Sequence, residues 1–266
     1  MERTPEYYLT KGLDMVVNGV AAVIFLCCLA YAGYALWDNW SILDGSGNAL
    51  KTMVEYKPDE AEGLSYNFSQ LMAMNPDVCG WLTLDHTKID YPVVQGTDNF
   101  EYLEKDVLGN PSVSGSIFLD WQNNRKFTDP YMVLMGHHMQ AGKMFGDLDK
   151  YSDETFFQKN TTGKIYLPDR VLYLETAAFL TVDAYDKYIY RTQWDNVSER
   201  QELLKRIYEQ AQYTRGEELT TEDQMVALST CSTSGTNARH VLICRIVHSS
   251  ASEEGSGKVY VETENE

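Results

Sequence analysis

Hydrophobic positions follow two different patterns along the chain, and the change between them divides it. Residues 15–37 read MVVNGVAAVIFLCCLAYAGYALW, with one Asn and no charged residue. This run is long enough to cross the roughly 30 Å hydrocarbon layer of a membrane as a helix, and Trp37 and Trp40 suit the membrane–water boundary. From residue 80 onward, short apolar runs alternate with turn residues, and this second pattern predicts strands.

The apolar run has a rival interpretation as a cleaved signal peptide, because AYA at 30–32 resembles a cleavage site. The run continues past that site and is long for a signal peptide, so a retained anchor is favoured. Arg3 and Lys11 precede the run, whereas the first basic residue after it is Lys51. Basic residues gather on the cytoplasmic side of membrane helices. We therefore expect a single-pass anchor in the cell membrane, with a cytoplasmic N-terminus and an extracellular domain after the apolar run.

The remaining pattern predicts a few helices and a strand-rich domain. A short helix is expected at 47–56 within a polar, acidic spacer, and another at 66–74, ending before Asn75-Pro76. Eight strand-like runs follow, at 81–84, 89–94, 116–120, 131–136, 164–167, 171–182, 224–231 and 240–248. Many short strands that must bury their edges predict a closed barrel or a sandwich.

One helix interrupts the strand series, between the sixth and seventh runs. Ser198-Glu199-Arg200-Gln201 is a capping-box pattern that predicts a helix start. The apolar residues behind it, up to about residue 213, fall on one stripe: Leu203, Leu204, Ile207, Tyr208 and Ala211. The stripe predicts a helix that covers the barrel.

Charge and cysteine usage exclude several classes of protein. The net charge is −17, from 22 basic and 39 acidic residues, and nucleic-acid binding needs a basic footprint instead. The five cysteines include no C-x-x-C pair, so neither a zinc site nor a disulfide framework is expected. A lone cysteine could then be a free, reactive thiol.

The stretch LSTCSTSGTNAR, residues 228–239, carries the most suggestive chemistry. A cysteine nucleophile must be a thiolate, reachable by substrate and close to a proton donor. His137 lies where the strand 131–136 passes into a loop, a usual place for working residues. If the strands before and after the loop are neighbours, Arg239 returns to the barrel end that holds Cys231. Taken alone, Cys231 is as readily a small buried residue.

A metal site at His137-His138 is the main alternative for the histidine pair. Adjacent residues on a strand point to opposite faces, which is poor geometry for binding one ion, and H-E-x-x-H is absent. His240 and His248 alternate with apolar residues on the last strand and are expected to be structural. No metal and no cofactor are predicted.

Taken together, four motifs between about Gly80 and Val247 resemble the sortases, and in detail class B. They are GWLTLDHTKIDYPVVQGTDNFEYL, SGSIFLDW, GHHMQAGKMFGDLDKY and LSTCSTSGTNARHVLICRIV, in this order. The resemblance implies a closed eight-stranded β-barrel with N-terminal helices, a helix between the sixth and seventh strands and a preceding transmembrane helix. It also implies a membrane-bound cysteine transpeptidase.

Such an enzyme cleaves a C-terminal sorting signal of secreted surface proteins after a threonine, through a thioester. It then transfers the acyl group to an amine, commonly of a cell-wall precursor. By motif, Cys231 is the nucleophile, His137 the general acid and base, and Arg239 binds the signal and stabilises the oxyanion. The residues expected to contact the signal are Ser229, Asn99, Leu103, Tyr188 and Ile189. The partners implied are this peptide, an amine acceptor and membrane lipid, but no nucleic acid.

Two departures and three rival functions accompany the resemblance. His138 stands where class B usually has Asn, so His138 is an alternative catalytic histidine; His137 is favoured because only it directly follows Gly136 at the strand end. The short loop 232–238 leaves the preferred signal open. A pilin-polymerising sortase and a hydrolytic cysteine peptidase of the cell surface are alternatives. A papain-like enzyme would have its histidine after the cysteine, whereas His137 precedes Cys231. A non-enzymatic tethered module would leave His137, Cys231 and Arg239 unexplained.

The expected domain organisation follows from these assignments. It comprises a cytoplasmic tail (1–14), a transmembrane anchor (15–37), an acidic juxtamembrane spacer (38–65), the catalytic domain (66–250) and an acidic C-terminal tail (251–266).

Overall fold

The computed structural model describes residues 5–59, 63–194, 196–231 and 237–251. Residues 232–236 of the loop after Cys231, and nearly all of the predicted C-terminal tail, lie outside the described residues. Contacts divide the chain into two units, residues 1–45 and 46–266, and each unit is described by itself.

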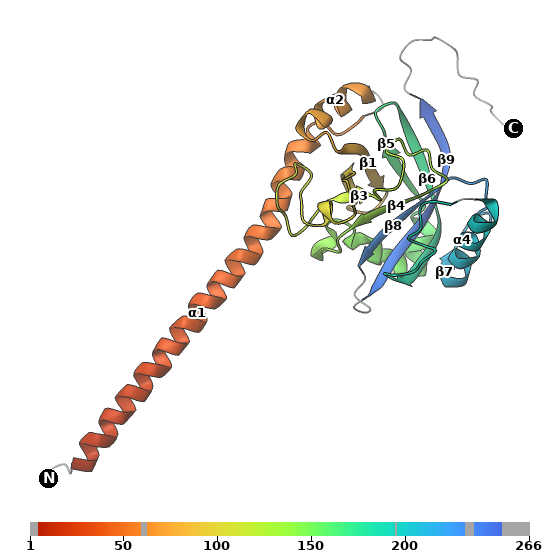
Figure 1. Cartoon of the computed structure of the whole chain (residues 1–266). Helices are drawn as coiled ribbons and strands as arrows, with labels where there is room; N and C mark the ends of the chain where they lie inside the picture. The colour runs from red at the N-terminus through yellow and green to blue at the C-terminus, as the bar shows by residue number, and fades with distance from the viewer. Residues whose placement is uncertain (1–4, 60–62, 195, 232–236, 252–266) are drawn as a thin grey trace. The chain divides into compact units, whose positions relative to one another are not determined.

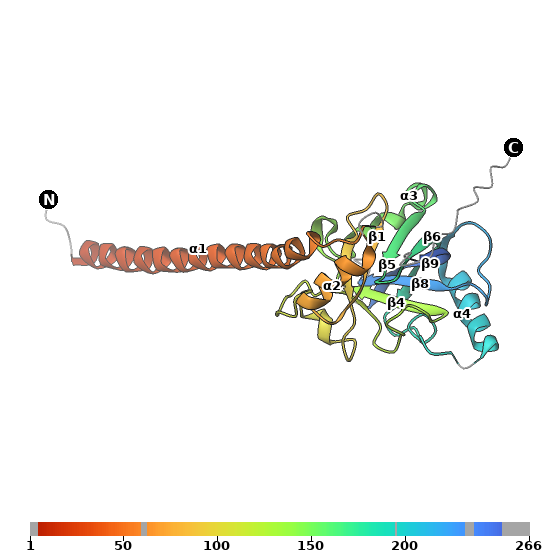
Figure 2. The same cartoon turned by 90° about the horizontal axis from the view of Figure 1, so that it is seen from above.

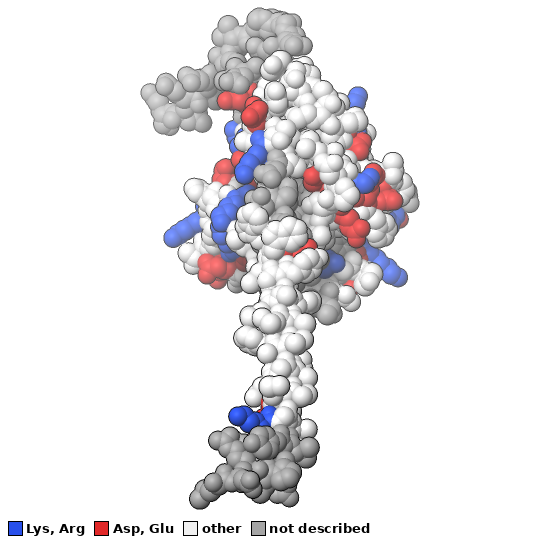
Figure 3. Space-filling view, turned by 90° about the vertical axis from the view of Figure 1, so that its left-hand side faces the viewer, with Lys and Arg blue, Asp and Glu red and all other residues white. Residues whose placement is uncertain are grey.

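The first unit is formed by most of helix α1, which runs from Pro5 to Val54. The most apolar 18 residues of its segment Lys11–Asp38 have a mean hydropathy of 2.3 and none of them is buried, so the segment is a candidate membrane span by length and composition. The face of the helix visible in Figure 3 is free of Lys, Arg, Asp and Glu over much of its length, and residues 15–37 contain none of them. The short helix expected at 47–56 is instead the last part of α1, where Ala49 and Met53 are buried.

The second unit holds three further helices and nine strands among the described residues. The helices are α2 (Leu64–Met74), α3 (Glu154–Lys159) and α4 (Val197–Gln210). The strands are β1 (Val78–Leu84), β2 (Asp90–Val94), β3 (Ile117–Leu119), β4 (Tyr131–Gly136), β5 (Thr162–Tyr166), β6 (Arg170–Asp183), β7 (Ala211–Thr214), β8 (Met225–Cys231) and β9 (Ala238–Ala251). All eight predicted strand runs are present, with ends that differ by a few residues.

Eight of these strands close into the predicted barrel, which is thereby confirmed. Their order is β5-β1-β2-β3-β4-β8-β9-β6, and β6 pairs with β5 to complete the ring (Figure 1). The barrel has no free edge along most of its circumference, as the many short strands require. Two shorter strands pair with successive parts of the long β6. Residues 171–175 pair with β5, and residues 178–180 pair with β7.

The connection after β6 differs in two details from the prediction. Helix α4 ends at Gln210. The residues predicted as its last turn form β7, a strand additional to the eight predicted runs. The N-cap is Asn196, whose side chain accepts a hydrogen bond from the backbone N–H of Glu199 at 3.0 Å. The capping residue therefore lies two positions before Ser198. As predicted, the helix covers the barrel, with Leu203, Leu204 and Ile207 buried (Figure 2).

Strands β4, β8 and β9 separate two apolar clusters. Alternate residues, among them Leu134, Leu228 and Leu242, fill the barrel interior; we call this the inner face. The residues between them, among them Val133, Ala227 and Val241, pack with Leu203 and Ile207 of α4; we call this the outer face. Because strand side chains alternate, every position on these three strands belongs to one of the two faces.

Candidate active site

The ends of β4, β8 and β9 bring His137, Cys231 and Arg239 to one edge of the barrel. In the antiparallel pair of β8 and β9, Cys231 stands directly opposite Arg239. In the parallel pair of β4 and β8, Gly136 stands opposite Thr230, so His137 follows at the level of Cys231. Alternation from Val133, Ala227 and Val241 assigns all three positions to the outer face.

The backbone around His137 is fixed by close packing. A Cβ atom at Gly136 would collide with the side chains of Ile117 and Phe145, so the strand can lie this close to the interior only with glycine there. The carbonyl of His137 accepts a hydrogen bond from the backbone N–H of Phe145 at 3.1 Å. The packing of Gly136 and the hydrogen bond to the His137 carbonyl together fix the backbone position of His137.

The ring of His137 is oriented by a backbone carbonyl. Its Nε2 lies 2.9 Å from the carbonyl oxygen of Leu103. A carbonyl oxygen only accepts hydrogen bonds, so Nε2 carries the proton in the neutral ring and Nδ1 is the nitrogen left to exchange one. Two of the predicted site residues are therefore in contact, because the main-chain carbonyl of Leu103 accepts a hydrogen bond from the ring of His137.

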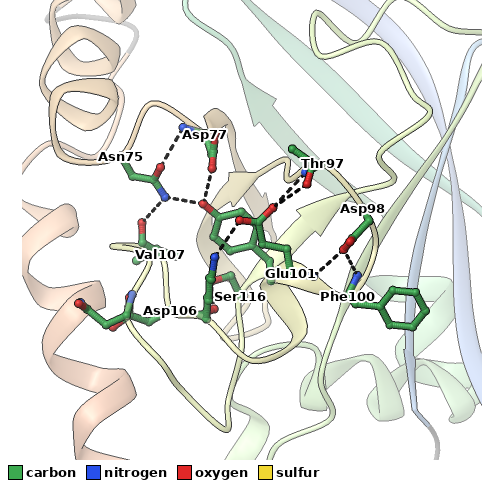
Figure 4. Close-up of polar contacts among 12 residues, drawn as sticks. Asn75, Asp77, Thr97, Asp98, Phe100, Glu101, Asp106, Val107 and Ser116 are labelled. Carbon is green, nitrogen blue, oxygen red and sulfur yellow. Dashed lines mark hydrogen bonds and ion pairs between the residues drawn. The ribbon is translucent and has the colours of Figure 1, made fainter.

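A network of polar contacts holds the segment that presents this carbonyl (Figure 4). The buried hydroxyl of Tyr102 donates to Asp77 at 2.8 Å and accepts from the amide of Asn75 at 2.9 Å. The carbonyl of Tyr102 accepts from the backbone N–H of Ser116 at 2.9 Å, and burial raises the pKa of its phenol. These bonds tie residues 101–103 to the loops before β1 and β3, which makes Leu103 a rigid acceptor.

Ser229 and Arg239 lie on the outer face with different surroundings. Ser229 is buried, with 3% of the residue exposed. Its hydroxyl oxygen lies 2.8 Å from the hydroxyl oxygen of Tyr190. The Arg239 guanidinium, half-buried, donates to the carbonyl of Ala238 at 3.3 Å. A peptide can therefore reach the serine only where Tyr190 gives way.

Asn99 is placed by the loop after β3. Its amide donates to Asp120 at 2.7 Å, and its carbonyl accepts from the backbone N–H of Trp121 at 3.0 Å. Asp120 also accepts from the Thr192 hydroxyl at 3.3 Å, from the segment after β6. Asn99 is partly exposed, as a residue in contact with a peptide must be.

The two residues predicted after the sixth strand have opposite environments. Tyr188 is 43% exposed, whereas Ile189 is fully buried in the cluster beneath α4. The carbonyl of Ile189 accepts from the Tyr131 hydroxyl at 2.8 Å, and its N–H donates to Asp186 at 3.1 Å. The Ile189 side chain is a core residue, so the expectation that it lines an open groove is wrong.

Two other cysteines of the second unit, Cys79 and Cys244, are structural. Cys79 and Cys244 are buried, and burial raises the pKa of each thiol to about 12. Such thiols are not ionised near neutral pH and are poor nucleophiles. Among the described residues, no group of His, Cys, Asp and Glu is arranged to hold a metal ion.

Sequence reasoning missed several residues that shape this site. Tyr102 and Tyr190 act through hydroxyl contacts between segments far apart in the chain. Asp149 lies between His138, the alternative to His137, and His240, which is expected to be structural. No local pattern indicates such pairings, because each depends on how the loops fold over the barrel end.

Comparison with known proteins identifies the class. A model of the sortase domain matches residues 82–247, more than half of the chain. The chain therefore belongs to the sortase family, whose members are cysteine transpeptidases. The relatives narrow this to class B: a sortase B of Listeria monocytogenes is 30% identical over 85% of this chain and 91% of its own length.

Solved structures of class B sortases share the fold. A Staphylococcus aureus sortase B–substrate complex superposes with a TM-score of 0.65 at 28% identity, covering 70% of this chain and 87% of that one. A Streptococcus pyogenes class B sortase involved in pilus biogenesis gives a TM-score of 0.61 at 36% identity, over 67% and 96% of the two chains. The resemblance predicted from the four motifs is thus confirmed at the level of class B.

Proposed function

We propose that this chain is a membrane-anchored class B sortase that cleaves a sorting signal after threonine and transfers the product to an amine of a cell-wall precursor. One observation carries the proposal: the strand register brings Cys231, Arg239 and His137 to the same barrel end and the same outer face. A substrate complex of a relative supports a sorting-signal peptide as the acyl donor.

In the first half-reaction, the thiolate of Cys231 attacks the carbonyl carbon of the threonine. The negative charge that develops on the carbonyl oxygen is stabilised by hydrogen bonds from the Arg239 guanidinium. The peptide C–N bond then breaks, and protonated His137 gives its Nδ1 proton to the leaving amine. The products are a thioester on Cys231 and the free C-terminal fragment of the signal.

In the second half-reaction, the acceptor amine attacks the thioester carbonyl. Neutral His137 accepts a proton at Nδ1 from that amine, and the C–S bond breaks to restore the thiolate. A new amide joins the threonine to the acceptor. The Leu103 carbonyl keeps the Nε2 proton of the histidine in place through both halves.

The apolar segment Lys11–Asp38 supports a single-pass anchor, and Arg3 and Lys11 before the apolar run favour a catalytic unit outside the cell. Sorting signals of secreted proteins and cell-wall amines are found there, so this orientation brings enzyme and substrates together. A reporter fused to the N-terminus should be protected from protease in intact cells, while the barrel is cleaved or labelled. Labelling of the N-terminal reporter in intact cells would contradict the orientation.

Acyl-enzyme trapping tests the nucleophile. The full chain in detergent is mixed with a threonine-containing signal peptide and examined by intact mass spectrometry. The wild type should gain the mass of the acyl fragment, whereas Cys231→Ala should not. Cys28→Ala is the matched control, since it removes a thiol of the apolar helix, outside the barrel. An adduct on Cys231→Ala would show that another residue is the nucleophile.

Pilin polymerisation is the second candidate function, and the Streptococcus pyogenes relative involved in pilus biogenesis favours it. The two functions differ in the acceptor amine, a lysine of another pilin against the amine of a wall precursor. The acylated enzyme offered both acceptors in competition should form the wall-type product faster. Preferential transfer to a pilin lysine would select the alternative, and release of the free acid alone would indicate a hydrolytic peptidase.

A further inference from the structure

A second cluster of titratable side chains lies at the same barrel end, on the opposite face from the candidate active site. One carboxylate oxygen of Asp149 is 2.6 Å from Nε2 of His138, and the other is 2.8 Å from Nδ1 of His240. An ionised carboxylate only accepts hydrogen bonds, so both rings donate to it. The bridge therefore requires a proton on Nε2 of His138 and on Nδ1 of His240.

Each histidine in this bridge is the chain neighbour of a residue of the active site. His138 follows His137, and His240 follows Arg239. His240 is also the register partner of Thr230, the residue before Cys231. By alternation, His240 belongs to the inner face, where its ring packs 5.2 Å from that of Phe179. Through these two hydrogen bonds, the carboxylate of Asp149 connects the end of β4 to the start of β9 on the inner face, opposite the candidate active site.

Asp149 is itself a fixed point. It belongs to a 3₁₀ segment, Gly146–Ser152, in which Leu148 and Tyr151 are fully buried in the barrel interior. The neighbouring Asp147 accepts from the backbone N–H of Lys88 at 2.7 Å, at the turn between β1 and β2. A charged hydrogen bond from an anchored segment holds its partners more firmly than a surface pair does.

We propose that Asp149 is a positioning residue, which holds His137 and Arg239 at a fixed spacing around Cys231 by clamping His138 and His240. This rests on the proposed transpeptidase function, and it assigns Asp149 no contact with substrate. A loss of the clamp displaces a general acid and an oxyanion donor slightly from the reacting carbonyl. It therefore lowers kcat more than it weakens peptide binding.

The kinetic arm of the test uses the full chain in detergent and a signal peptide. Asp149→Ala should lower kcat about tenfold, less than the hundredfold of a 1 Å misplacement, with KM within about twofold. His138→Ala should lose a similar amount, and His138→Gln, whose amide reaches as far as Nε2, should restore it. Asp169→Ala is the charge-matched control, because that carboxylate is exposed on the turn between β5 and β6.

The spectroscopic arm does not depend on turnover. The chain has five histidines, so ¹⁵N labelling of histidine alone gives a spectrum that single variants can assign. The wild type should show protonated Nε2 in His138 and protonated Nδ1 in His240 at neutral pH. In Asp149→Ala both signals should change, and the His137 ring signals should shift with them, whereas Asp169→Ala should leave all of them unchanged.

The two arms separate failure of this proposal from failure of the proposed function. Wild-type kcat in Asp149→Ala, or an unshifted His137 ring, would overturn the positioning role. So would a loss of activity that His138→Gln fails to restore. If the wild type transfers no peptide at all, the proposed function fails, and the response of the His137 signals still decides whether Asp149 positions that residue.

Discussion

The two faces at the barrel end use neighbouring residues in opposite ways. On the inner face, His138 and His240 are both engaged by one carboxylate, at 2.6 and 2.8 Å. On the outer face, His137 makes its hydrogen bond with a backbone carbonyl and keeps Nδ1 for proton exchange. His137 and His138 are consecutive, yet the ring of one contacts a backbone carbonyl and the ring of the other contacts a carboxylate.

The difference shows how strand alternation separates the two roles. A β-strand sends successive side chains to opposite faces, so a residue and its neighbour meet unrelated surroundings. On the outer face His137 is partly exposed, whereas on the inner face His138 and His240 are both hydrogen-bonded to Asp149. Each prediction below breaks one side of this comparison, beginning with the largest expected effect.

The histidine pair gives the sharpest contrast. His137→Ala removes the general acid and should lower kcat/KM by about 10²–10⁴, whereas His138→Ala should cost about tenfold at most, since it acts only through position. Both variants are compared in a peptide transfer assay under the same conditions. A larger loss in His138→Ala than in His137→Ala would reverse the assignment of the two faces.

Arg239 tests the oxyanion role on the outer face. Arg239→Ala should lower kcat by about 10²–10³, the usual cost of losing one oxyanion donor. Arg239→Lys keeps the charge but loses the planar pair of donors, so it should recover only part of the rate. Presteady-state formation of the thioester is the measurement. A thioester that forms at the wild-type rate in Arg239→Ala would exclude this role.

Tyr102 tests the rigid support of the Leu103 carbonyl. Tyr102→Phe leaves the buried Asp77 and Asn75 without their shared hydroxyl partner and should lower the free energy of unfolding by about 1–3 kcal/mol. Urea denaturation of the variant measures this cost. Tyr185→Phe is the control, because Tyr185 is 79% exposed. Equal stability of both variants would mean that the network in Figure 4 contributes little.

Asp186 gives the smallest effect, in the pH dependence of stability. Burial alone raises its pKa, but the backbone N–H of Ile189 and the Arg206 guanidinium outweigh burial and hold the pKa below 3.8. This stabilisation is present above the unfolded pKa of about 3.9 and is lost as the pH falls through the lower folded value. Asp186→Asn should therefore flatten the loss of stability below about pH 4, measured by urea midpoints. An unchanged acid slope would contradict it.

Much of the barrel was predictable because its signals are local. Apolar runs bounded by turn residues indicated all eight barrel strands, and the run from Tyr131 to Gly136 has the predicted ends. Helix ends were less predictable: α4 begins with Asn196 as its cap and ends before β7. Pairing with the second half of β6, a long-range contact, turned the last predicted residues of the helix into a strand.

The proximity of the candidate site residues was predictable from the sequence, but their surroundings were predictable only in part. His137 follows the end of β4, Cys231 is the last residue of β8 and Arg239 is the second residue of β9. These strand ends share one barrel edge, which brings the three residues together. Ile189 was misjudged, because the spacing after β6 gives no sign that this residue turns beneath α4. Tyr190 and Asp149 were missed, since their partners lie 39 residues away at Ser229 and 91 residues away at His240.

The sequence by itself determined the candidate span, the eight strand runs and the motifs that carry the candidate reactive residues. These depend on apolar periodicity, turn chemistry and short motifs, all of which are local. Only the tertiary structure decided that the strands close into a barrel, which nitrogen of His137 is bonded to a backbone carbonyl, and which carboxylate lies between His138 and His240. Those outcomes depend on hydrogen bonds between distant segments, whose partners are set by the folded loops and not by their neighbours in the chain.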